Sequence, residues 1–236
     1  MNISPDATIF WQWGPVSLNA TIVFTWLVMG LLVLLSWLIT RNLSVESGLT
    51  RRQMMLETIV SAIRKQIREI TGRDPDDYLP FLGTLFLFIS LSNFLAIVPG
   101  YQPPTGSLTT TSALAVCVFF AVPAFGIAKD GVGRYLRHYI RPSVFMLPFH
   151  VIGELSRTLA LAVRLFGNVM SGTLIAGLLL SVAPLFLPVL MQALGLLIGQ
   201  IQAYIFAILA TVYIASASRA REGGAPKAGG QPTEGG

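Results

Sequence analysis

Residues 16–40 read VSLNATIVFTWLVMGLLVLLSWLIT, a stretch without a charged side chain that is long enough to cross a lipid bilayer. Trp11, Trp13 and Trp37 stand near its two ends, which suits the preference of aromatic side chains for the membrane–water interface. Residues 1–15 contain no Lys or Arg, unlike the basic start of a cleavable signal peptide. The stretch therefore predicts a retained membrane helix that follows a short extracytoplasmic segment.

The composition of the whole chain agrees with a membrane protein and excludes an ordinary soluble domain. Hydrophobic residues make up 53% of the 236 residues and charged residues 11%, whereas soluble domains are about 25% charged. One cysteine, Cys117, and two histidines cannot form an internal disulfide or a zinc-type ligand cluster, so no metal site is expected. The net charge of +5 does not indicate nucleic-acid binding, because the basic residues lie mainly in loops between apolar stretches.

Four further apolar stretches predict membrane helices, which makes about five in all. They cover residues 79–99, 112–128, 143–183 and 189–218. The stretch 143–183 is too long for one upright helix, so we expect it to form, with 189–218, a long hairpin that is steeply tilted or nearly horizontal. Residues 51–70 carry apolar side chains at helical spacing among charged ones, which predicts an amphipathic cytoplasmic helix. The predicted fold is an all-α integral membrane protein with a single membrane domain, residues 16–218.

The basic residues are distributed unevenly between the loops, and this predicts the orientation of the chain. Seven lie between the first and second spans, four between the third and fourth, and three in the tail, residues 219–236, which we expect to be disordered. None lies in residues 1–15, 100–111 or 181–190. Because loops rich in Lys and Arg stay in the cytoplasm, the N-terminus is predicted outside and the C-terminus in the cytoplasm.

Three charged side chains interrupt the apolar stretch 143–183, namely Glu154, Arg157 and Arg164. A charge near the middle of a bilayer costs from about 2.5 to more than about 10 kcal/mol. At about 100° per residue, the polar residues of this segment fall on one stripe of a helix. The stripe consists of Glu154, Arg157, Arg164, Asn168 and Ser171. It must face water, another polar helix or a partner subunit, because lipid would leave its donors unpaired.

The counter-charges available to these side chains differ. Glu154 and Arg157 stand at i and i+3, so they either neutralise each other and anchor the helix or belong to a functional stripe. Arg164 has no acidic residue near it in sequence toward the C-terminus, since the next one is Glu222. Arg164 therefore either snorkels toward the membrane surface or meets a carboxylate that another protein supplies, and we expect the second.

The segment around Arg164 resembles the signature of subunit a of F-type ATP synthases. The residues that carry the resemblance are Arg164-Leu-Phe-Gly-Asn168, with Gly153-Glu-Leu-Ser-Arg-Thr-Leu before them and Ser171-Gly172 after them. Two more motifs resemble the same family, Ser92-Asn93 with Val98-Pro99 in the second span and the run from Gln200 to Ile214 in the last. The resemblance extends in order from about residue 80 to residue 218 and fits the predicted topology.

This resemblance implies a function and a set of partners. In the family, subunit a is a non-catalytic stator channel beside a ring of c subunits, each of which carries an ionisable carboxylate. By the resemblance, Arg164 faces that carboxylate, and two aqueous half-channels couple H⁺ or Na⁺ flow to rotation of the ring. The implied partners are the c-ring, a b-type peripheral stalk, the soluble ATPase sector and the lipid of a bacterial plasma (inner) membrane. No tightly bound cofactor and no catalytic residue is implied, and the sequence has no P-loop pattern.

Several other polar positions match the family as candidates for the ion path or for helix pairing. They are Asn168, Gln202, Glu154, Arg157, Ser171, Thr173 and Tyr213. By the resemblance, Asn168 matches a polar residue near the path of the carboxylate, and Gln202 matches a glutamine opposite the arginine. Tyr213 and Ser216 fall on the same face of the last helix as Gln202.

The sequence departs from the family where relay groups are expected. Thr173 stands where many members carry an acid, and Gly195 where many carry a histidine or an acid. Ala96, Ser107 and Thr109 replace further acidic or amide positions. Hydroxyls and amides coordinate a hydrated Na⁺ but do not titrate near neutral pH. The departures therefore leave the transported ion open and indicate a variant branch, coupled to Na⁺ or acting chiefly as an ATP-driven pump.

Two other classes of function also fit the polar stripe. One is a self-contained secondary transporter with its site between broken helices, which predicts ion flux from the purified chain alone. The other is a purely structural membrane subunit whose stripe docks a partner. Replacement of Arg164 by Ala separates the structural subunit from the stator, because a docking residue is needed for assembly and the stator arginine is needed for transport.

Overall fold

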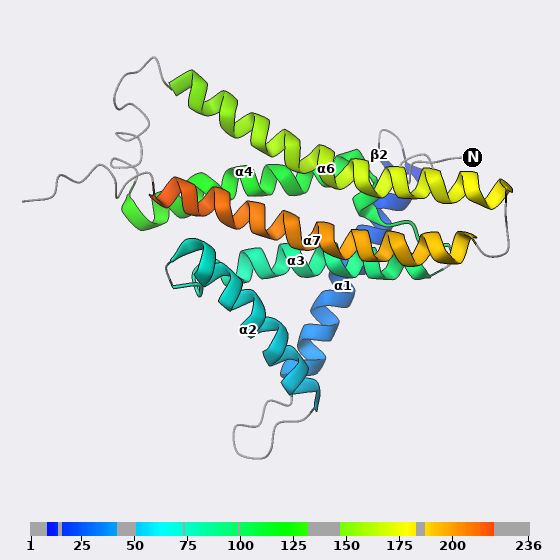
Figure 1. Ribbon diagram of the computed structural model, residues 1–236, viewed down its shortest axis with the longest axis horizontal. Coiled ribbons are helices and arrows are strands. Elements are labelled where there is room, and N and C mark those ends of the chain that lie inside the picture. The colour runs from blue at the N-terminus through cyan, green and yellow to red at the C-terminus, as the bar shows by residue number, and fades with distance from the viewer. Residues whose placement is uncertain are drawn as a thin grey trace, which may run out of the picture.

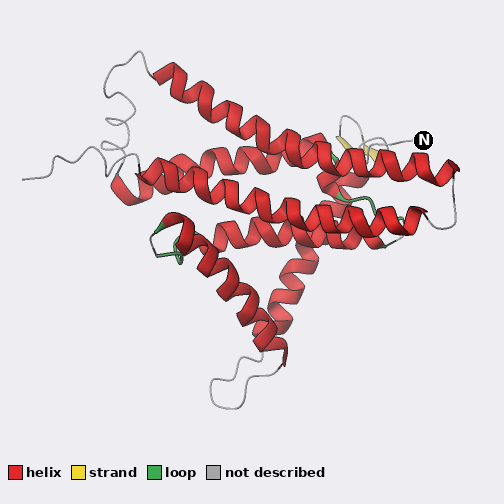
Figure 2. Ribbon diagram, in the orientation of Figure 1, coloured by secondary structure: helices red, strands yellow, loops and turns green. Residues whose placement is uncertain are grey.

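The computed structural model describes residues 9–13, 16–41, 51–72, 74–98, 100–131, 147–182 and 187–219, and these residues are mostly helical (Figure 2). Five helices have the length and composition to cross a membrane. They are α1 (Ala20–Thr40), α3 (Leu79–Phe94, extended by a 3₁₀ turn at Leu95–Ile97), α4 (Leu108–Asp130), α6 (Leu147–Val182) and α7 (Leu187–Arg219). The prediction of an all-α membrane protein with about five membrane helices is therefore confirmed.

Two short strands, absent from the sequence-based expectation, precede the first helix. β1 (Ile9–Trp13) pairs antiparallel with β2 (Val16–Asn19). β-Branched and aromatic residues favour this extended pairing. The first membrane helix consequently begins at Ala20 rather than at residue 16, and Asn19 before it has an extended backbone with φ −79° and ψ 155°.

The third membrane helix begins earlier than its apolar stretch. α4 starts at Leu108, whereas hydropathy predicts residues 112–128. The Thr111 hydroxyl donates a hydrogen bond to the carbonyl of Ser107 at 3.1 Å. Because a threonine hydroxyl bonded to the preceding turn is satisfied within the helix, polar residues can join the first turn of a membrane helix despite their low hydropathy.

α6 and α7 are the longest helices and pack against each other as the predicted hairpin (Figure 1). α6 has 36 residues, which corresponds to about 54 Å at about 1.5 Å per residue. The hydrocarbon core of a bilayer is only about 30 Å thick, so a helix of this length must tilt strongly to stay within it. Figure 1 also shows that the first part of α6 diverges from α7, while the remainder runs beside it.

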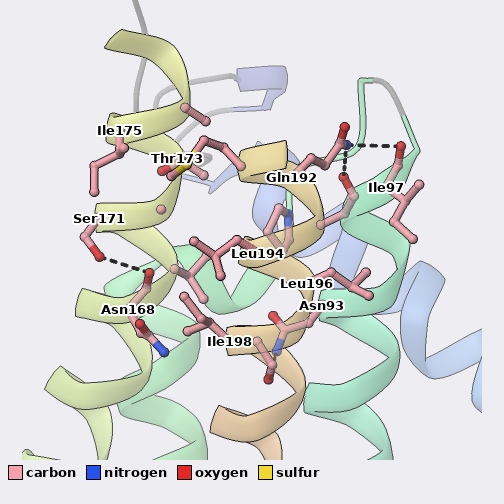
Figure 3. A pocket seen from close by; sticks show the side chains of 18 of the residues that line it. Asn93, Ile97, Asn168, Ser171, Thr173, Ile175, Gln192, Leu194, Leu196 and Ile198 are labelled. Atoms are coloured by element: carbon pink, nitrogen blue, oxygen red, sulfur yellow. Dashed lines mark hydrogen bonds between the residues drawn. The ribbon is translucent and has the colours of Figure 1, made fainter. Parts of the chain in front are cut away.

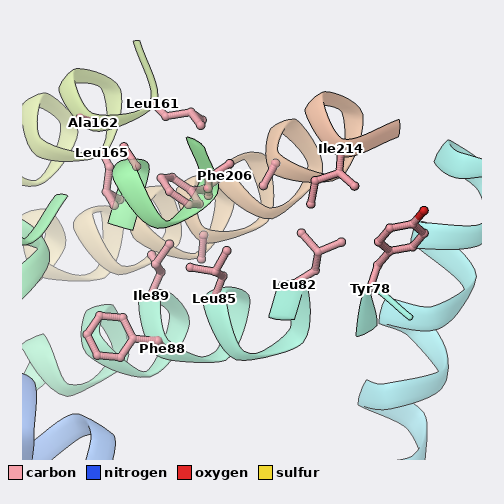
Figure 4. Close-up of a cluster of buried hydrophobic side chains, with 14 of the residues drawn as sticks. Tyr78, Leu82, Leu85, Phe88, Ile89, Leu161, Ala162, Leu165, Phe206 and Ile214 are labelled. Carbon is pink, nitrogen blue, oxygen red and sulfur yellow. The ribbon is translucent and has the colours of Figure 1, made fainter. Parts of the chain in front are cut away.

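α3, α4, α6 and α7 share one apolar core (Figure 4). Its fully buried side chains include Leu82, Ile89, Leu161, Leu165, Phe206 and Ile214. Lipid is as apolar as these side chains, so the core gains its stability from close packing rather than from escape from water. This packing fixes the positions of the four helices from which the polar residues of the site project.

α1 and α2 extend to one side of this four-helix core (Figure 1). Only 11% of the membrane window of α1 is buried inside the chain. α2 (Arg51–Thr71) is the amphipathic helix predicted at residues 51–70. Its Ile67 is 3% exposed and belongs to the core, and the helix ends before Gly72, whose φ of 67° suits the position after a helix.

Some expectations concern residues outside those described. The tail predicted to be disordered, residues 219–236, lies outside them except for Arg219, which ends α7. Residues 1–8 of the N-terminal segment and the basic loop at residues 132–146 also lie outside the described residues.

Candidate functional site

Arg164 projects from the open side of α6. Leu161 and Leu165, three residues before it and one after it, are 1% and 0% exposed and pack into the core, whereas Arg164 is exposed. No ion pair found among the described residues includes Arg164. The guanidinium can therefore meet a group from outside the described part of the chain.

One turn beyond Arg164, an amide pair joins α6 to α7. The side-chain N–H of Asn168 donates to Oε1 of Gln202 at 3.4 Å. Gln202 is 4% exposed, and its Nε2 atom has no hydrogen-bond partner among the described residues. A buried donor left without a partner is costly, so this position favours an additional acceptor. The structure thus brings together the two amides that the family resemblance associates with the arginine.

Two turns before Arg164, a second polar contact joins the same helices. The guanidinium carbon of Arg157 lies 5.6 Å from the centre of the Tyr213 ring, a distance typical of a cation–π contact. Neither of the ion pairs within the described ranges joins Arg157 to Glu154. Glu154 lies beside the contact, because it lines a small cavity together with Arg157, Tyr213 and residues of α4.

A cavity of about 500 Å³ opens between the second half of α6, the first half of α7 and the end of α3 (Figure 3). Ser171 and Thr173 line it from α6, and Gly195 lines it from α7. Asn168 lines it as well, so the cavity extends to about one helical turn from Arg164. Thr173 and Gly195, the two positions at which the family resemblance predicts proton-relay groups, therefore border the same space.

The polar side chains of this cavity are hydroxyls and amides. Ser171 and Thr173 donate hydrogen bonds to carbonyls of the preceding turn of α6, at 3.1 and 2.8 Å. The Nε2 atom of Gln192 lies 3.3 Å from the carbonyl oxygen of Ala96 and so links α7 to the end of α3. Among the described residues that line the cavity, none is acidic or basic. The cavity is large enough for several water molecules and offers them neutral oxygen atoms.

A buried polar contact between α3 and α7 borders the cavity and does not follow from sequence spacing. The side-chain N–H of Asn93 donates to the carbonyl of Gly199 at 2.8 Å, and the Thr105 hydroxyl donates to Oδ1 of Asn93 at 3.1 Å. A Cβ atom on Gly199 would lie 3.0 Å from the Asn93 side chain, so a larger residue here would force the Asn93 side chain to shift. The spacing of Gly195 and Gly199 indicates close helix packing, and the structure shows a close contact at Gly199 but not at Gly195.

The loop that follows α3 borders the same cavity. Tyr101 lines the cavity and packs edge-on against Phe24 of α1, with ring centres 4.9 Å apart. Burial raises the pKa of the Tyr101 phenol above its ordinary value of 10.0, and the nearby Ser92 hydroxyl lowers this pKa by less. The phenol therefore stays protonated at neutral pH and acts as a neutral hydrogen-bonding group.

Comparison with known proteins covers nearly the whole helical region. The family model described as ATP synthase A chain matches residues 22–215. The chain is 65% identical to ATP synthase subunit a 2 of Acaryochloris marina over 219 residues, which cover 93% of this chain and 94% of that protein. It is 60% identical to ATP synthase subunit a 1 of Crocosphaera subtropica, with 92% and 94% covered. It is 59% identical to ATP synthase subunit a of Albidiferax ferrireducens, with 94% and 96% covered.

Proposed function

The chain belongs to the ATP synthase A chain family, and we propose that it is the stator channel of the membrane sector. It is a multi-pass subunit of that sector of an ATP synthase. In this proposal, Arg164 faces the carboxylate of a c-subunit ring, and two aqueous half-channels lead ions to and from that carboxylate. ATP chemistry belongs to the soluble sector, and a b-type peripheral stalk holds the stator against the ring. The N-terminus lies outside and the C-terminus in the cytoplasm of a bacterial plasma membrane.

The observation that carries the proposal is the position of Arg164. It lies on the exposed face of α6, about one helical turn from the inner end of the polar cavity. The guanidinium is exposed, no described residue forms an ion pair with it, and the cavity reaches Asn168 one turn away. A fixed positive charge at this point stabilises the ionised form of a passing carboxylate, which lowers the pKa of that carboxylate and releases its ion. The same charge repels a cation that would cross directly from one half-channel to the other.

The cavity beside Thr173 and Gly195 is the outer half-channel in this proposal, and the inner half-channel follows the earlier part of α6, where Glu154 lies. The hydroxyls and amides that line the cavity support passage of a hydrated ion, H⁺ or Na⁺. Asn168 and Gln202 stand at the inner end of the path. Each elementary charge that crosses about 100 mV supplies about 2.3 kcal/mol, so several ions must cross for each ATP made.

Replacement of Arg164 by Ala in the whole complex tests the stator role. We expect ATP-driven ion uptake by inverted vesicles to be abolished while the amount of assembled complex stays near that of the parent. Arg41→Ala is the matched control, because it removes another exposed arginine, which packs over Trp37 at the end of α1. Loss of the complex itself in Arg164→Ala would favour the structural subunit, and ion flux from the purified chain alone would favour the secondary transporter.

The same vesicles identify the ion. ATP-driven uptake is measured while Na⁺ is varied and a protonophore is added. Sodium uptake that resists the protonophore assigns Na⁺, whereas acidification that needs no Na⁺ and collapses with the protonophore assigns H⁺.

A further inference from the structure

Two polar contacts join α6 to α7, and they lie on either side of Arg164. One is the amide pair of Asn168 and Gln202, and the other is the contact of Arg157 with the Tyr213 ring. The two contacts are about three helical turns apart on each helix, so they fit one antiparallel alignment of α6 with α7. Together they tie the polar stripe of α6 to its neighbour at two points.

Arg164 lies on the same stripe between these two points. At about 100° per residue, Arg157 is about 20° from Arg164 around the helix, and Asn168 is about 40° from it. Along the helix axis, Arg157 is about 10 Å from Arg164 and Asn168 about 6 Å. The rotation of α6 about its own axis therefore decides both whether the two contacts can form and where the Arg164 guanidinium lies.

We propose that Arg157 and Tyr213 form a positioning pair, whose cation–π contact fixes the rotation of α6 and so holds Arg164 in its working position. This inference rests on the proposed role of Arg164. Apolar side chains that pack in lipid have little directional preference, whereas contact of a guanidinium with a ring face restricts the helix to a limited range of rotations. The contact matters most on this side of Arg164, because the first part of α6 diverges from α7 (Figure 1).

The residues around Arg157 and Tyr213 support a defined contact between the two side chains. They do not favour an Arg157 side chain that only extends toward the lipid headgroups. Tyr213 packs against the apolar core, and Val118 and Val122 of α4 border the same small cavity as Arg157. Three helices thus meet around the guanidinium and the ring. If Arg157 acted only as a charged anchor at the membrane surface, the identity of residue 213 would not matter.

Paired substitutions in the whole complex test the proposal. Tyr213→Leu removes the ring but keeps an apolar side chain, whereas Tyr213→Phe keeps the ring and is the matched control. Arg157→Gln removes the cation, whereas Arg157→Lys keeps it. ATP-driven ion uptake is normalised to the amount of assembled complex, so that failure to assemble is separated from failure to transport.

We expect Tyr213→Leu and Arg157→Gln each to lower uptake per complex by about fivefold, the upper size of a cation–π contact whose guanidinium is exposed, as that of Arg157 is. The double variant should be no worse than the poorer single variant, because both changes remove the same contact. Tyr213→Phe and Arg157→Lys should keep at least about half of the parent uptake, since a phenyl ring and an ammonium group still form the contact. Equal uptake in Tyr213→Leu and Tyr213→Phe, or losses that multiply in the double variant, would overturn the proposal.

A distance measurement tests the rotation directly. Spin labels are attached at Val163 of α6 and Ile201 of α7, both about half exposed, in a Cys117→Ser background. Double electron–electron resonance should give one narrow distance distribution in the parent and in Tyr213→Phe, and a shifted or broadened one in Tyr213→Leu. An unchanged distribution in Tyr213→Leu would refute the positioning role. Arg164→Ala is run in parallel, because normal uptake in that variant would contradict the proposed function itself, whatever the positioning pair does.

Discussion

The Asn93 side chain ties α3 to α7 through one glycine carbonyl. Asn93 is 5% exposed, and it donates to the carbonyl of Gly199 while it accepts a hydrogen bond from Thr105. Each such bond contributes only about 0.5–1.5 kcal/mol net, but a buried amide that loses its partners costs about 1–3 kcal/mol. The stability of this corner therefore depends on how closely the two helices approach at residue 199.

Gly199→Ala should destabilise the protein, whereas Gly195→Ala should not. A Cβ atom at 199 would lie 3.0 Å from Asn93 and press its amide away from its two partners, the Gly199 carbonyl and the Thr105 hydroxyl, whereas a Cβ atom at 195 meets no atom within 4 Å. We expect a loss of about 1–3 kcal/mol for the first variant, since a buried amide becomes unsatisfied. Thermal denaturation of the solubilised complex measures the difference, and equal melting temperatures for the two variants would contradict the assigned role of the Asn93 contact.

Among the helices, α2 depends on a few apolar side chains for its position. The ion pair of Arg64 with Asp76 is 2.8 Å long, but both side chains are more than half exposed. Such a pair contributes about 0–1 kcal/mol because water screens it. Ile67, at 3% exposure, packs into the core, and the partly buried Ile63 packs against it, so apolar contacts hold the end of α2 against the bundle.

Ile67→Ser should loosen α2, while Ile59→Ser should leave it in place. Loss of the buried isoleucine is expected to cost at least about 2 kcal/mol, the lower range for removal of a large buried side chain. Ile59 is the matched control, because it is on the same helix but 44% exposed. Hydrogen exchange of the amides at residues 60–71 provides the measurement. If the two variants exchanged equally fast, Ile67 would not be the residue that docks α2.

The starting residues of two membrane helices were predicted wrongly, because hydropathy does not report the hydrogen bonds that determine where a helix begins. The span expected from residue 16 begins at Ala20, because Val16–Asn19 pairs as a strand with an earlier segment. The span expected from residue 112 begins at Leu108, because threonine hydroxyls bond back to the helix and become compatible with it. The existence of each span was predicted correctly, since a bilayer requires long apolar runs whatever their ends do.

At the scale of the whole molecule, the sequence predicted which residues of α6 form a polar stripe. It did not predict which residues of α7 contact that stripe. The spacing of Arg157, Arg164 and Asn168 defines a stripe on one helix, and that spacing is visible in the sequence. The partners of the stripe, Tyr213 and Gln202, depend on the alignment of two helices that are far apart in the chain. Helix pairing of this kind follows from packing in three dimensions, which residue spacing alone does not specify.

The orientation of the whole molecule leads to a labelling prediction. Single cysteines are introduced at Asp74, in the loop before α3, and at Thr109, at the start of α4, in a Cys117→Ser background. Both positions are exposed. Because basic loops stay in the cytoplasm, a membrane-impermeant maleimide should label Thr109→Cys in intact cells and Asp74→Cys only in inverted vesicles. The reverse pattern would invert the topology and exchange the outer and inner half-channels.

The exposure of α1 has a consequence for biogenesis. This helix leaves 89% of its membrane window unburied by the rest of the chain, as follows from the 11% that is buried. Of the five described spans, it is also the first to leave the ribosome and to reach the insertion machinery. A segment that needs so little from its own polypeptide can partition into lipid as soon as it is made. We therefore expect the N-terminal span to insert co-translationally, before the helices of the four-helix core pack together.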